Sequence, residues 1–231
     1  MRSSPGDPSG VHEIELILPC LDEAEGLRWL LPRVPMGVGV VVADNGSVDG
    51  SREVAQQWGA DVIQVSRRGY GAACHAGLLA ARAEIVVVMD ADGSCDPAQL
   101  DRVIDPVRDH SYDLMIGGRR PVSRRAQPWQ LRLANRVLAA RLNRRTGLRL
   151  HDLGPTRAAR RTDLLGLGLT DRRSGYPAET VVRAADAGWR IGQTWLDYRV
   201  RAGRSKVTGT PLGAWRAVQD MSAAIAGPDR A

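Results

Sequence analysis

Short apolar runs recur along the chain and alternate with longer stretches in which apolar and polar residues are mixed. The clearest run, residues 84–89, is Glu-Ile-Val-Val-Val-Met, and its β-branched residues indicate a strand buried on both faces of a sheet. Comparable runs predict strands at residues 14–18, 38–42, 61–65, 112–116 and 190–200. The mixed stretches predict helices that begin near residues 21 and 51, helices at residues 72–83, 97–108, 129–145, 177–187 and 211–225, and one more after a connection at residues 151–157.

This alternation predicts an α/β fold in which right-handed βαβ units build a Rossmann-like, mostly parallel sheet with helices on both faces. The chain has 231 residues and neither an internal repeat nor a low-complexity linker, so we expect a single domain. Residues 1–12 are polar and contain several prolines and glycines, which predicts a disordered tail before a domain at residues 13–226.

Two carboxylates follow the clearest strand directly. Because ligands bind open parallel sheets at the carboxyl ends of their strands, Asp90 and Asp92 lie where a site is expected. Residues two apart in an extended segment project to the same side, so both acids can bind one ion, and Mg²⁺ and Mn²⁺ prefer such oxygen ligands. The alternative is an acidic turn before the next helix, with Asp96 as N-cap and Pro97 as the first helical residue. That alternative explains Asp96 but not the acid pair.

Loops with acids or glycines follow three further predicted strands, at residues 19–25, 44–51 and 67–71. We expect all of them along the edge that holds the acid pair. There, carboxylates can accept hydrogen bonds from a base and ribose, and backbone amides can face phosphates. By itself, the Gly69-x-Gly71 pattern indicates a tight strand-to-helix turn equally well, and it matches neither the triple-glycine dinucleotide fingerprint nor a P-loop.

Composition and charge narrow the classes of partner. The chain is 43% hydrophobic and 25% charged, which is typical of a globular protein, and its net charge of +6 favours a nucleotide, a phospholipid surface or nucleic acid. No apolar run is long enough to cross a bilayer and the first residues do not resemble a signal peptide, so we expect a cytoplasmic protein. Cys20, Cys74 and Cys95 fit no metal or disulfide spacing and are expected to be buried thiols.

The motifs at the predicted edge resemble those of one enzyme family. Residues 18–25 (Leu-Pro-Cys-Leu-Asp-Glu-Ala-Glu) resemble the Pro-x-Tyr-Asn-Glu segment of family 2 glycosyltransferases, and residues 44–51 are similar to their Asp-Asp-Gly-Ser-x-Asp-Gly-Thr stretch. Residues 68–73 and 90–92 resemble the glycine-rich loop and the metal-binding Asp-x-Asp of that family. Farther along, residues 117–119, 152–157 and 203–206 resemble motifs of its polyprenyl-phosphate (dolichol-phosphate) sugar synthase branch.

The resemblance implies a GT-A fold and the inverting transfer of a sugar from a nucleotide diphosphate-sugar. It implies a donor half at residues 13–118, an acceptor half at residues 119–226, and a divalent metal (Mg²⁺ or Mn²⁺) on Asp90 and on Asp92, which is also a catalytic candidate. The donor residues that it implies are Pro19, Leu21, Glu23, Asp44, Gly69, Gly71, Asp90, Ala91 and Asp92. The departures from the family pattern are Leu21 for an aromatic residue, Asp22 for an asparagine, and Ser94 for a glutamine that helps the metal.

The charge of the acceptor decides which residues it needs. A phosphate acceptor is already ionised and needs cations, whereas a hydroxyl acceptor needs a general base. The candidates for binding a phosphate are Arg119, Arg157, Ser205 and Lys206, the last being the only lysine of the chain. For a base or an acceptor-orienting residue the best carboxylates are Asp152 and Glu179, although a cap, a salt bridge or a first-turn position also explains them. We predict a polyprenyl phosphate acceptor, with a soluble or glycan hydroxyl as the alternative.

Helix 129–145 is predicted either to pack on the core with a wet arginine face or, for a lipid acceptor, to rest on anionic headgroups at the inner face of the plasma membrane. Its packed side is expected to contain Leu131, Ala134, Val137 and Leu138, and further arginines occupy positions 119, 120, 124 and 125. A non-catalytic basic module that binds nucleic acid or membrane is less favoured, because the acids would repel a phosphate backbone. A nucleotidyltransferase, which releases pyrophosphate, is the last alternative. The sequence does not fix the oligomeric state.

Overall fold

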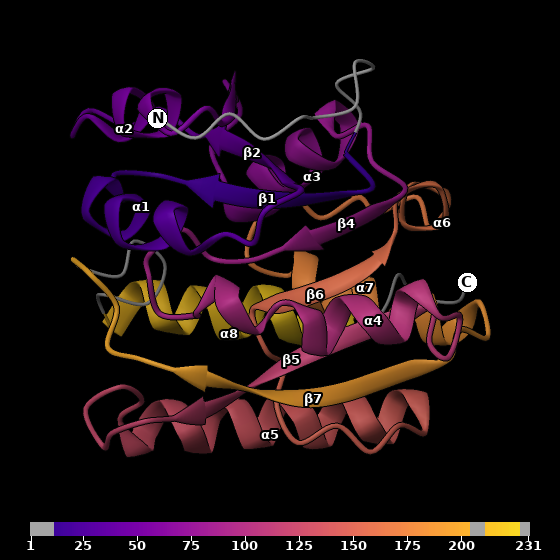
Figure 1. Ribbon diagram of the computed structural model, residues 1–231. Coiled ribbons are helices and arrows are strands. Elements are labelled where there is room, and N and C mark those ends of the chain that lie inside the picture. Colours follow the sequence, from indigo (N-terminus) through magenta and orange to yellow (C-terminus); the bar gives the residue numbers. More distant parts are fainter. Residues whose placement is uncertain (1–11, 204–210, 227–231) are drawn as a thin grey trace.

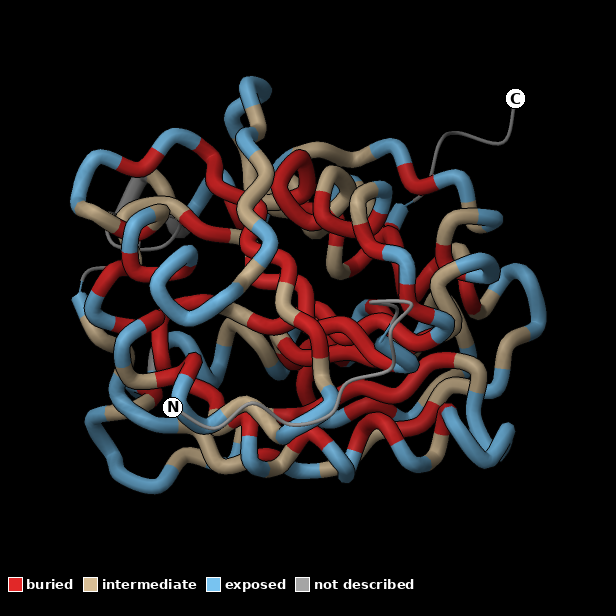
Figure 2. The backbone as a smooth tube through the Cα atoms, turned by 45° about the horizontal axis from the view of Figure 1, so that its top comes forward, coloured by how far each residue is buried: buried red, intermediate tan, exposed pale blue. Residues whose placement is uncertain are grey.

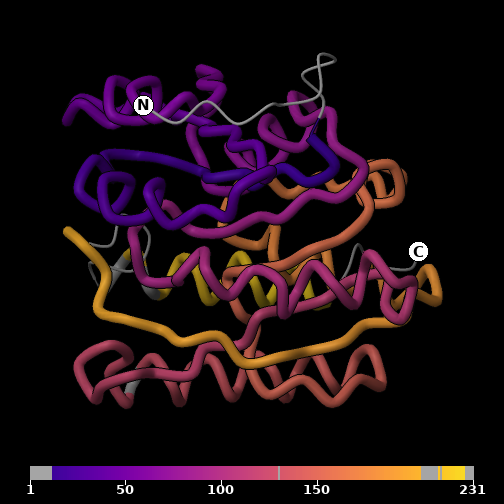
Figure 3. Tube along the Cα trace, in the orientation of Figure 1, coloured from indigo at the N-terminus to yellow at the C-terminus, as the bar shows by residue number. Residues whose placement is uncertain are grey.

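The computed structural model describes residues 12–203 and 211–226 of the chain. Of the predicted tail at residues 1–12 only His12 falls within these ranges, and Ser205 and Lys206 lie outside them. In Figure 3 the indigo and purple segments fill the upper part of the view and most of the pink and orange segments the lower part. The first strands and helices of the described chain therefore lie largely on one side of the fold and most of the later ones on the other.

One sheet of seven strands forms the centre of the described fold. Its order is β3-β2-β1-β4-β6-β5-β7, and within it only β6 runs antiparallel to its neighbours (Figure 1). The strands are β1 (Ile14–Cys20), β2 (Val38–Asp44), β3 (Asp61–Gln64), β4 (Ile85–Val88), β5 (Leu114–Pro121), β6 (Thr156–Arg160) and β7 (Ile191–Tyr198). The carboxyl ends of the parallel strands share the left edge of Figure 1, and the predicted α/β fold with a mostly parallel sheet is confirmed.

Helices cover both faces of this sheet (Figure 1). Leu16 and Val87 pack in a core with residues of α1, α2 and α4, whereas Ile17 and Val86 pack in a second core with residues of α3, α5, α6, α7 and α8. Successive residues of β1 and β4 enter opposite cores, which explains why β4 is apolar throughout and lies in the buried centre of the fold (Figure 2). The helices are α1 (Ala24–Leu30), α2 (Ser51–Gln57), α3 (Tyr70–Ala80), α4 (Asp101–Arg108), α5 (Trp129–Thr146), α6 (Arg161–Gly166), α7 (Tyr176–Asp186) and α8 (Pro211–Ala226), with 3₁₀ turns η1 (Leu31–Arg33) and η2 (Pro97–Gln99).

Strand β6 is the main difference from the sequence prediction, which has the connection at residues 151–157 lead straight into a helix. The structure has β6 first and the short helix α6 after it. β6 pairs with β4 and β5, and its Arg157 lies opposite Val88 and Ile116. The residues of β6 are Thr-Arg-Ala-Ala-Arg, which lack the β-branched apolar side chains that mark a strand. Pairing with the backbone groups of β4 and β5 decides its structure instead.

The predicted packed side of helix α5 is confirmed at Leu138 and wrong at Leu131 and Val137. Leu138, Ala139 and Leu142 are buried, whereas Leu131 and Val137 are 42% and 46% exposed. The helix lies at the outer edge of the fold, where it contacts α7 and α8 (Figure 1). Leu138 and Leu142 lie in a core that includes residues of α7 and α8, whereas apolar residues earlier in α5 stay exposed.

Candidate active site

Strand β4 ends in the acid pair at the edge predicted from the sequence. We define residues 90–92 as the acid loop. Asp92 is buried and accepts a hydrogen bond from Ser94 N at 2.9 Å, while half-buried Asp90 accepts one from the Tyr70 hydroxyl at 3.1 Å. Asp96 caps η2 through its side chain, as predicted. The acid loop is therefore distinct from the helix-capping acid.

Helix α1 lies directly on the acid loop. A Cβ at Gly26 would lie 2.7 Å from the Cα of Asp92 and closer still to the carbonyl oxygen of Ala91. Only glycine permits two backbones to approach so closely. The chain then turns at Gly93, whose φ of 73° lies in the left-handed region that favours glycine. These two glycines hold the acid loop against α1.

The acid loop is chemically suited to a divalent cation. Burial raises the pKa of Asp90 and the charge of Asp92 raises it further, while the charges of Arg201 and Arg119 oppose the rise. The Ser94 hydroxyl is fully buried and has no hydrogen-bond partner among the described residues. Two carboxylates and a hydroxyl are hard oxygen ligands of the kind that Mg²⁺ and Mn²⁺ prefer. Residues 12–203 and 211–226 contain no cluster of three acidic, histidine or cysteine ligands.

The loops after β1 and β2 lie side by side at the same edge. The strand register pairs Pro19 with Ala43 and Cys20 with Asp44. Buried Asp44 accepts hydrogen bonds from the backbone N of Gly46 and Ser47 at 3.3 and 3.1 Å, so its carboxylate orders its own loop. Leu21 and Glu23 follow β1 and are half-buried. The four residues predicted to hold a base and ribose thus lie at the same part of the edge.

Asp22, which replaces an asparagine of the family pattern, joins these two loops. Its Oδ1 accepts a hydrogen bond from Val48 N at 2.8 Å, and its backbone N donates to Ser47 Oγ at 2.9 Å. Its φ of 53° lies in the left-handed region, which aspartate and asparagine tolerate better than most residues. The substitution therefore keeps a residue type that suits the turn.

Residues 67–71, which we define as the glycine loop, run into the first turn of α3 and make room for another part of the backbone. A Cβ at Gly71 would lie 2.9 Å from the carbonyl oxygen of Arg173, and one at Gly69 would clash with the carbonyl oxygen of Arg172. The two glycine amides have protein partners: Gly69 N donates to Asn45 Oδ1 at 2.8 Å and Gly71 N to the Arg173 carbonyl at 3.0 Å. The described contacts therefore explain the glycines by close packing and leave donor binding by these residues a prediction.

Glu179 binds the backbone of residues 170–171, just before Arg172 and Arg173, whose backbone packs on the glycine loop. Its carboxylate accepts hydrogen bonds from Thr170 N at 3.0 Å and Asp171 N at 2.7 Å, and Arg183 Nε donates to it at 2.8 Å. Burial would raise its pKa, but these hydrogen bonds and the charge of Arg183 lower it below the ordinary value. Glu179 lies in the first turn of α7, and its contacts favour a structural role over that of a base.

Asp152 binds Arg119 of β5 closely. Its carboxylate accepts hydrogen bonds from the Arg119 backbone N at 2.6 Å, from Nε at 3.0 Å and from Nη2 at 2.8 Å. Asn135 of α5 donates to the same carboxylate and accepts from Arg119 Nη2 at 2.9 Å. Protein donors occupy both oxygens of this carboxylate, so the geometry favours the orienting role predicted for Asp152. Sequence reasoning missed Asn135, because nothing in the pattern of α5 separates it from other polar positions.

Arg157 points into the protein. It is buried, and its Nη1 and Nη2 donate to the carbonyl oxygens of Pro177 and Gly154 at 2.9 and 2.6 Å. The sequence prediction of an acceptor cation treats Arg157 as part of a connection, whereas β6 directs its side chain inward. These contacts give Arg157 a structural role and leave Arg119, at 22% side-chain exposure, as the better acceptor cation of the two.

We expect Arg157→Ala to lower the free energy of unfolding by about 2–4 kcal/mol, because it leaves two buried carbonyls without a donor and opens a cavity. Urea denaturation measures this change. The control is Arg173→Ala, because Arg173 is 65% exposed and its ion pair with Asp220 spans 3.4 Å. Such an exposed pair contributes about 1 kcal/mol or less. Full stability of Arg157→Ala together with weaker acceptor binding would contradict the structural role.

Two cavities of the described structure lie away from the acid loop. One of about 490 Å³ lies between α5 and β7 and is lined by residues that include Arg136, Leu150, His151 and Trp195. Another, of about 450 Å³, lies near the amino ends of β1 and β2. No acid-loop residue lines either cavity, so the carboxylates and not the cavities define the candidate site.

Comparison with known proteins identifies the family. The family model described as glycosyl transferase family 2 matches residues 16–167, more than half of the chain. The chain belongs to glycosyl transferase family 2. An uncharacterized glycosyltransferase of Mycobacterium tuberculosis is 45% identical to it over 90% of this chain and 95% of that protein. The dolichyl-phosphate hexose transferase of Haloferax volcanii is 31% identical over 80% of each chain.

A solved structure agrees with the fold of this family 2 glycosyltransferase. The glucosyl-3-phosphoglycerate synthase of Mycobacterium tuberculosis, crystallised with Mn²⁺, UDP and phosphoglyceric acid, superposes with a TM-score of 0.69 at 25% identity, over 96% of this chain and 81% of that chain. The predicted family and GT-A fold are confirmed, and membership in an enzyme family argues against a non-catalytic module. No helix within the described ranges is both long and apolar enough to cross a membrane.

Proposed function

We propose that this glycosyltransferase moves a sugar, with inversion, from a nucleotide diphosphate-sugar to a polyprenyl phosphate and that it requires a divalent metal ion. The observation that carries the proposal is the acid loop at the carboxyl edge of the sheet, with a cationic Arg119 near enough to influence the pKa of Asp90. The similarity to a dolichyl-phosphate hexose transferase supports the lipid phosphate, and the similarity to an enzyme crystallised with Mn²⁺ and UDP supports the metal and the donor class.

On the donor side, Asp90 and Asp92 would hold the metal ion, with Ser94 close by. The ion would supply positive charge to the departing diphosphate, where negative charge develops in the transition state. The loops that contain Pro19, Leu21, Glu23 and Asp44 would hold the base and ribose. This division assigns residues 13–118 to the donor and residues 119–226 to the acceptor.

On the acceptor side, the described residues offer the guanidinium of Arg119, whereas the two carboxylates that the sequence proposes as a base are hydrogen-bonded to other groups. The two candidate carboxylates, Asp152 and Glu179, are both occupied by protein donors. A phosphate acceptor is already an anion near neutral pH and attacks without losing a proton, so it needs only to be held. Arg119 presents a guanidinium whose fork suits phosphate, and Asp152 and Asn135 fix its orientation.

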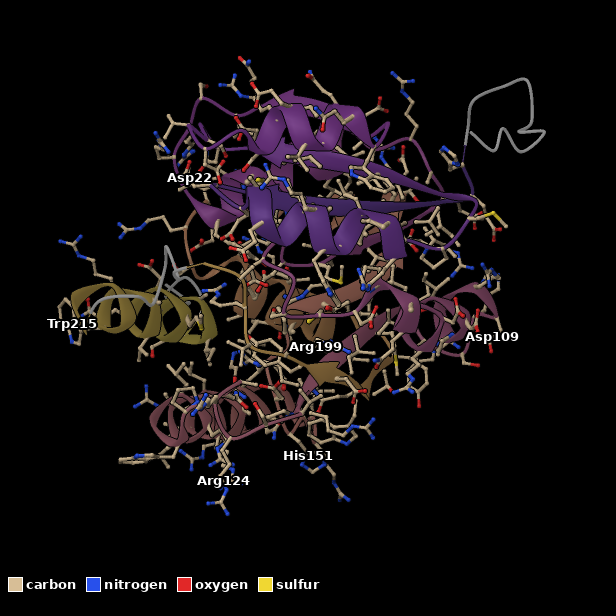
Figure 4. The ribbon with its side chains drawn as sticks, turned by 60° about the vertical axis from the view of Figure 1, so that its left-hand side comes forward. Asp22, Asp109, Arg124, His151, Arg199 and Trp215 are labelled. Carbon is tan, nitrogen blue, oxygen red and sulfur yellow. The ribbon has the colours of Figure 1, made fainter. Side chains whose placement is uncertain are left out.

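Helices α5 and α8 would supply contact with the membrane surface that holds such a lipid. On α5, Trp129 is 64% exposed and Leu133 53% exposed, among arginines that favour anionic headgroups. Trp215 of α8 is also exposed, and Figure 4 places Trp215 and Arg124 at the periphery beside these two helices. This arrangement supports a peripheral protein at the inner face of the plasma membrane.

A soluble hydroxyl acceptor is the second candidate. It is favoured by the similarity to glucosyl-3-phosphoglycerate synthase, which was crystallised with phosphoglyceric acid. The two candidates share the donor site and differ in whether the acceptor must lose a proton.

The test is a transfer assay on the full chain with UDP- and GDP-sugars and with polyprenyl phosphate in vesicles that contain anionic lipid. We expect a lipid-linked sugar of inverted anomeric configuration and one nucleoside diphosphate for each transfer. A chelator should abolish transfer and added Mn²⁺ or Mg²⁺ should restore it, because the acid loop provides only part of the ion's coordination. Polyprenol without phosphate is the matched control acceptor. Transfer to polyprenol or to phosphoglyceric acid in preference to polyprenyl phosphate would support the second candidate.

A further inference from the structure

An arginine occupies the carboxylate that we assign to the metal ion. Arg201 Nε donates to Asp92 Oδ2 at 2.8 Å, and its Nη2 contacts the same oxygen. The Asp92 side chain is 2% exposed and that of Arg201 29% exposed. A carboxylate as buried as this one needs a cationic partner. Arg201 is that partner in the described structure, and it holds the oxygen that a metal ion would use.

The backbone keeps Arg201 beside the acid loop. We define residues 198–202 as the strap. Tyr198 forms a bridge with Cys95, Arg199 N donates to the Ser94 carbonyl at 2.8 Å, and Ala202 N donates to the Asp92 carbonyl at 2.9 Å. The strap is thus tied to the residues that follow β4 on both sides of Arg201. The Arg201 side chain can change its partner while its backbone stays in place.

We propose that Arg201 is a binding residue for the donor diphosphate that exchanges partners when the donor arrives: its guanidinium leaves Asp92 for the diphosphate as the metal ion takes the carboxylate. This inference rests on the proposed function and deepens it. Before the exchange Asp92 is paired with Arg201. After it, Asp92 is paired with the ion and Arg201 with the diphosphate, so neither charge is left unpaired in a partly buried site. Arginine suits this role because its planar fork binds carboxylate and phosphate in the same way.

Two simpler roles predict different behaviour. If Arg201 only competes with the ion, its loss should tighten the binding of both the ion and the nucleotide. If it only ties down the strap, its loss should weaken both. Of the three roles, only partner exchange predicts that the loss of Arg201 tightens the binding of the ion and weakens the binding of the nucleotide. The reason is that Arg201 obstructs the ion and assists the diphosphate.

The experiment compares the wild-type full chain with Arg201→Gln. Mn²⁺ binding without nucleotide is measured by electron paramagnetic resonance, and UDP binding at saturating Mn²⁺ is measured by calorimetry, with GDP as the second probe. We expect Arg201→Gln to bind Mn²⁺ about five times more tightly and UDP or GDP about ten times more weakly, the scale of one charge-assisted hydrogen-bond pair.

The matched control is Arg199→Gln, which removes the same charge from the same strap. Arg199 is exposed and its Cζ lies 5.2 Å from the Trp29 ring, where Figure 4 labels it, and not on a carboxylate. Both affinities should therefore change by less than about twofold. Arg201→Lys, which keeps the charge and loses the fork, should bind UDP with intermediate affinity, and melting temperatures check that each variant is folded.

Four results would overturn the inference. Mn²⁺ affinity of Arg201→Gln no higher than that of Arg199→Gln would mean that Arg201 does not obstruct the ion. Unchanged or tighter nucleotide binding would leave it a competitor only, and weaker binding of both would make it structural. If the wild-type chain binds neither Mn²⁺ nor UDP nor GDP, the proposed function itself fails and the inference fails with it.

Discussion

Asp92→Asn is expected to reduce sugar transfer by about a thousandfold, the scale for losing a group that stabilises charge in the transition state. The reason is the loss of one of two carboxylates that would hold the metal ion against the diphosphate. An asparagine Oδ1 can still accept the hydrogen bond from Ser94 N, so the acid loop should keep its shape. The measurements are kcat/KM for transfer and the affinity for Mn²⁺ without substrate, and both should fall.

Asp96→Asn is the matched control for this substitution. Asp96 also accepts a backbone hydrogen bond, from Ala98 N at 3.1 Å, but it caps η2 and is not part of the acid loop. We expect transfer close to the wild-type rate and, at most, a small loss of stability. If Asp92→Asn transfers sugar at the wild-type rate, the acid loop does not bind a required ion and the proposed function must be abandoned.

The acid loop could be predicted from the sequence because its place follows from one strong local signal. A run of β-branched residues identifies a buried strand, and the residues that follow such a strand lie at the ligand-binding edge. The ion pair of Arg201 with Asp92 could not be predicted in this way, because the two residues are 109 positions apart. Their contact depends on how β7 and the strap return across the end of β4, which no local pattern encodes.

Strand β6, and with it the inward direction of Arg157, was missed because its sequence gives no strand signal. The residues of β6 show no period of two in apolar side chains, and their strand structure comes from pairing with β4 and β5. Once β6 is taken as a strand, Arg157 must point to one face of a buried sheet, and a guanidinium there needs carbonyl acceptors. The missed strand therefore left one predicted site residue in a connection, whereas its side chain contacts two backbone carbonyls; its role toward an acceptor stays a prediction.

Two ion pairs at the edge share one arrangement, in which the arginine is more exposed than its carboxylate partner. Asp152 is bonded to Arg119 and Asn135, so on this pair the guanidinium is the more accessible member, at 22% side-chain exposure against 5% for Asp152. Asp92 is bonded to Arg201, and here too the arginine is the more exposed member. Both pairs thus present a cation to the outside and keep their carboxylate covered. Such an edge favours anionic ligands such as a diphosphate and a phosphate, in keeping with the net charge of +6.

Gly26→Ala is expected to reduce kcat/KM by about a hundredfold, the effect of misplacing a reactive group by about 1 Å. The added Cβ would meet backbone atoms of Ala91 and Asp92, at 2.7 Å for the Asp92 Cα, and backbone cannot rotate out of the way as a side chain can. Either α1 or the acid loop must shift. Such overpacking should also lower the free energy of unfolding by about 1–3 kcal/mol, which urea denaturation measures.

Gly166→Ala is the matched control, because a Cβ at Gly166 would have nothing within 4 Å and this residue ends helix α6. We expect unchanged kcat/KM and a free energy of unfolding that is equal or higher by up to about 1 kcal/mol, since alanine has the higher helix propensity. The two variants add the same methyl group, so a difference between them reports the contact of α1 with the acid loop. Wild-type kcat/KM and stability in Gly26→Ala would show that the loop accommodates the methyl group, and that α1 does not set the position of the metal-binding carboxylates.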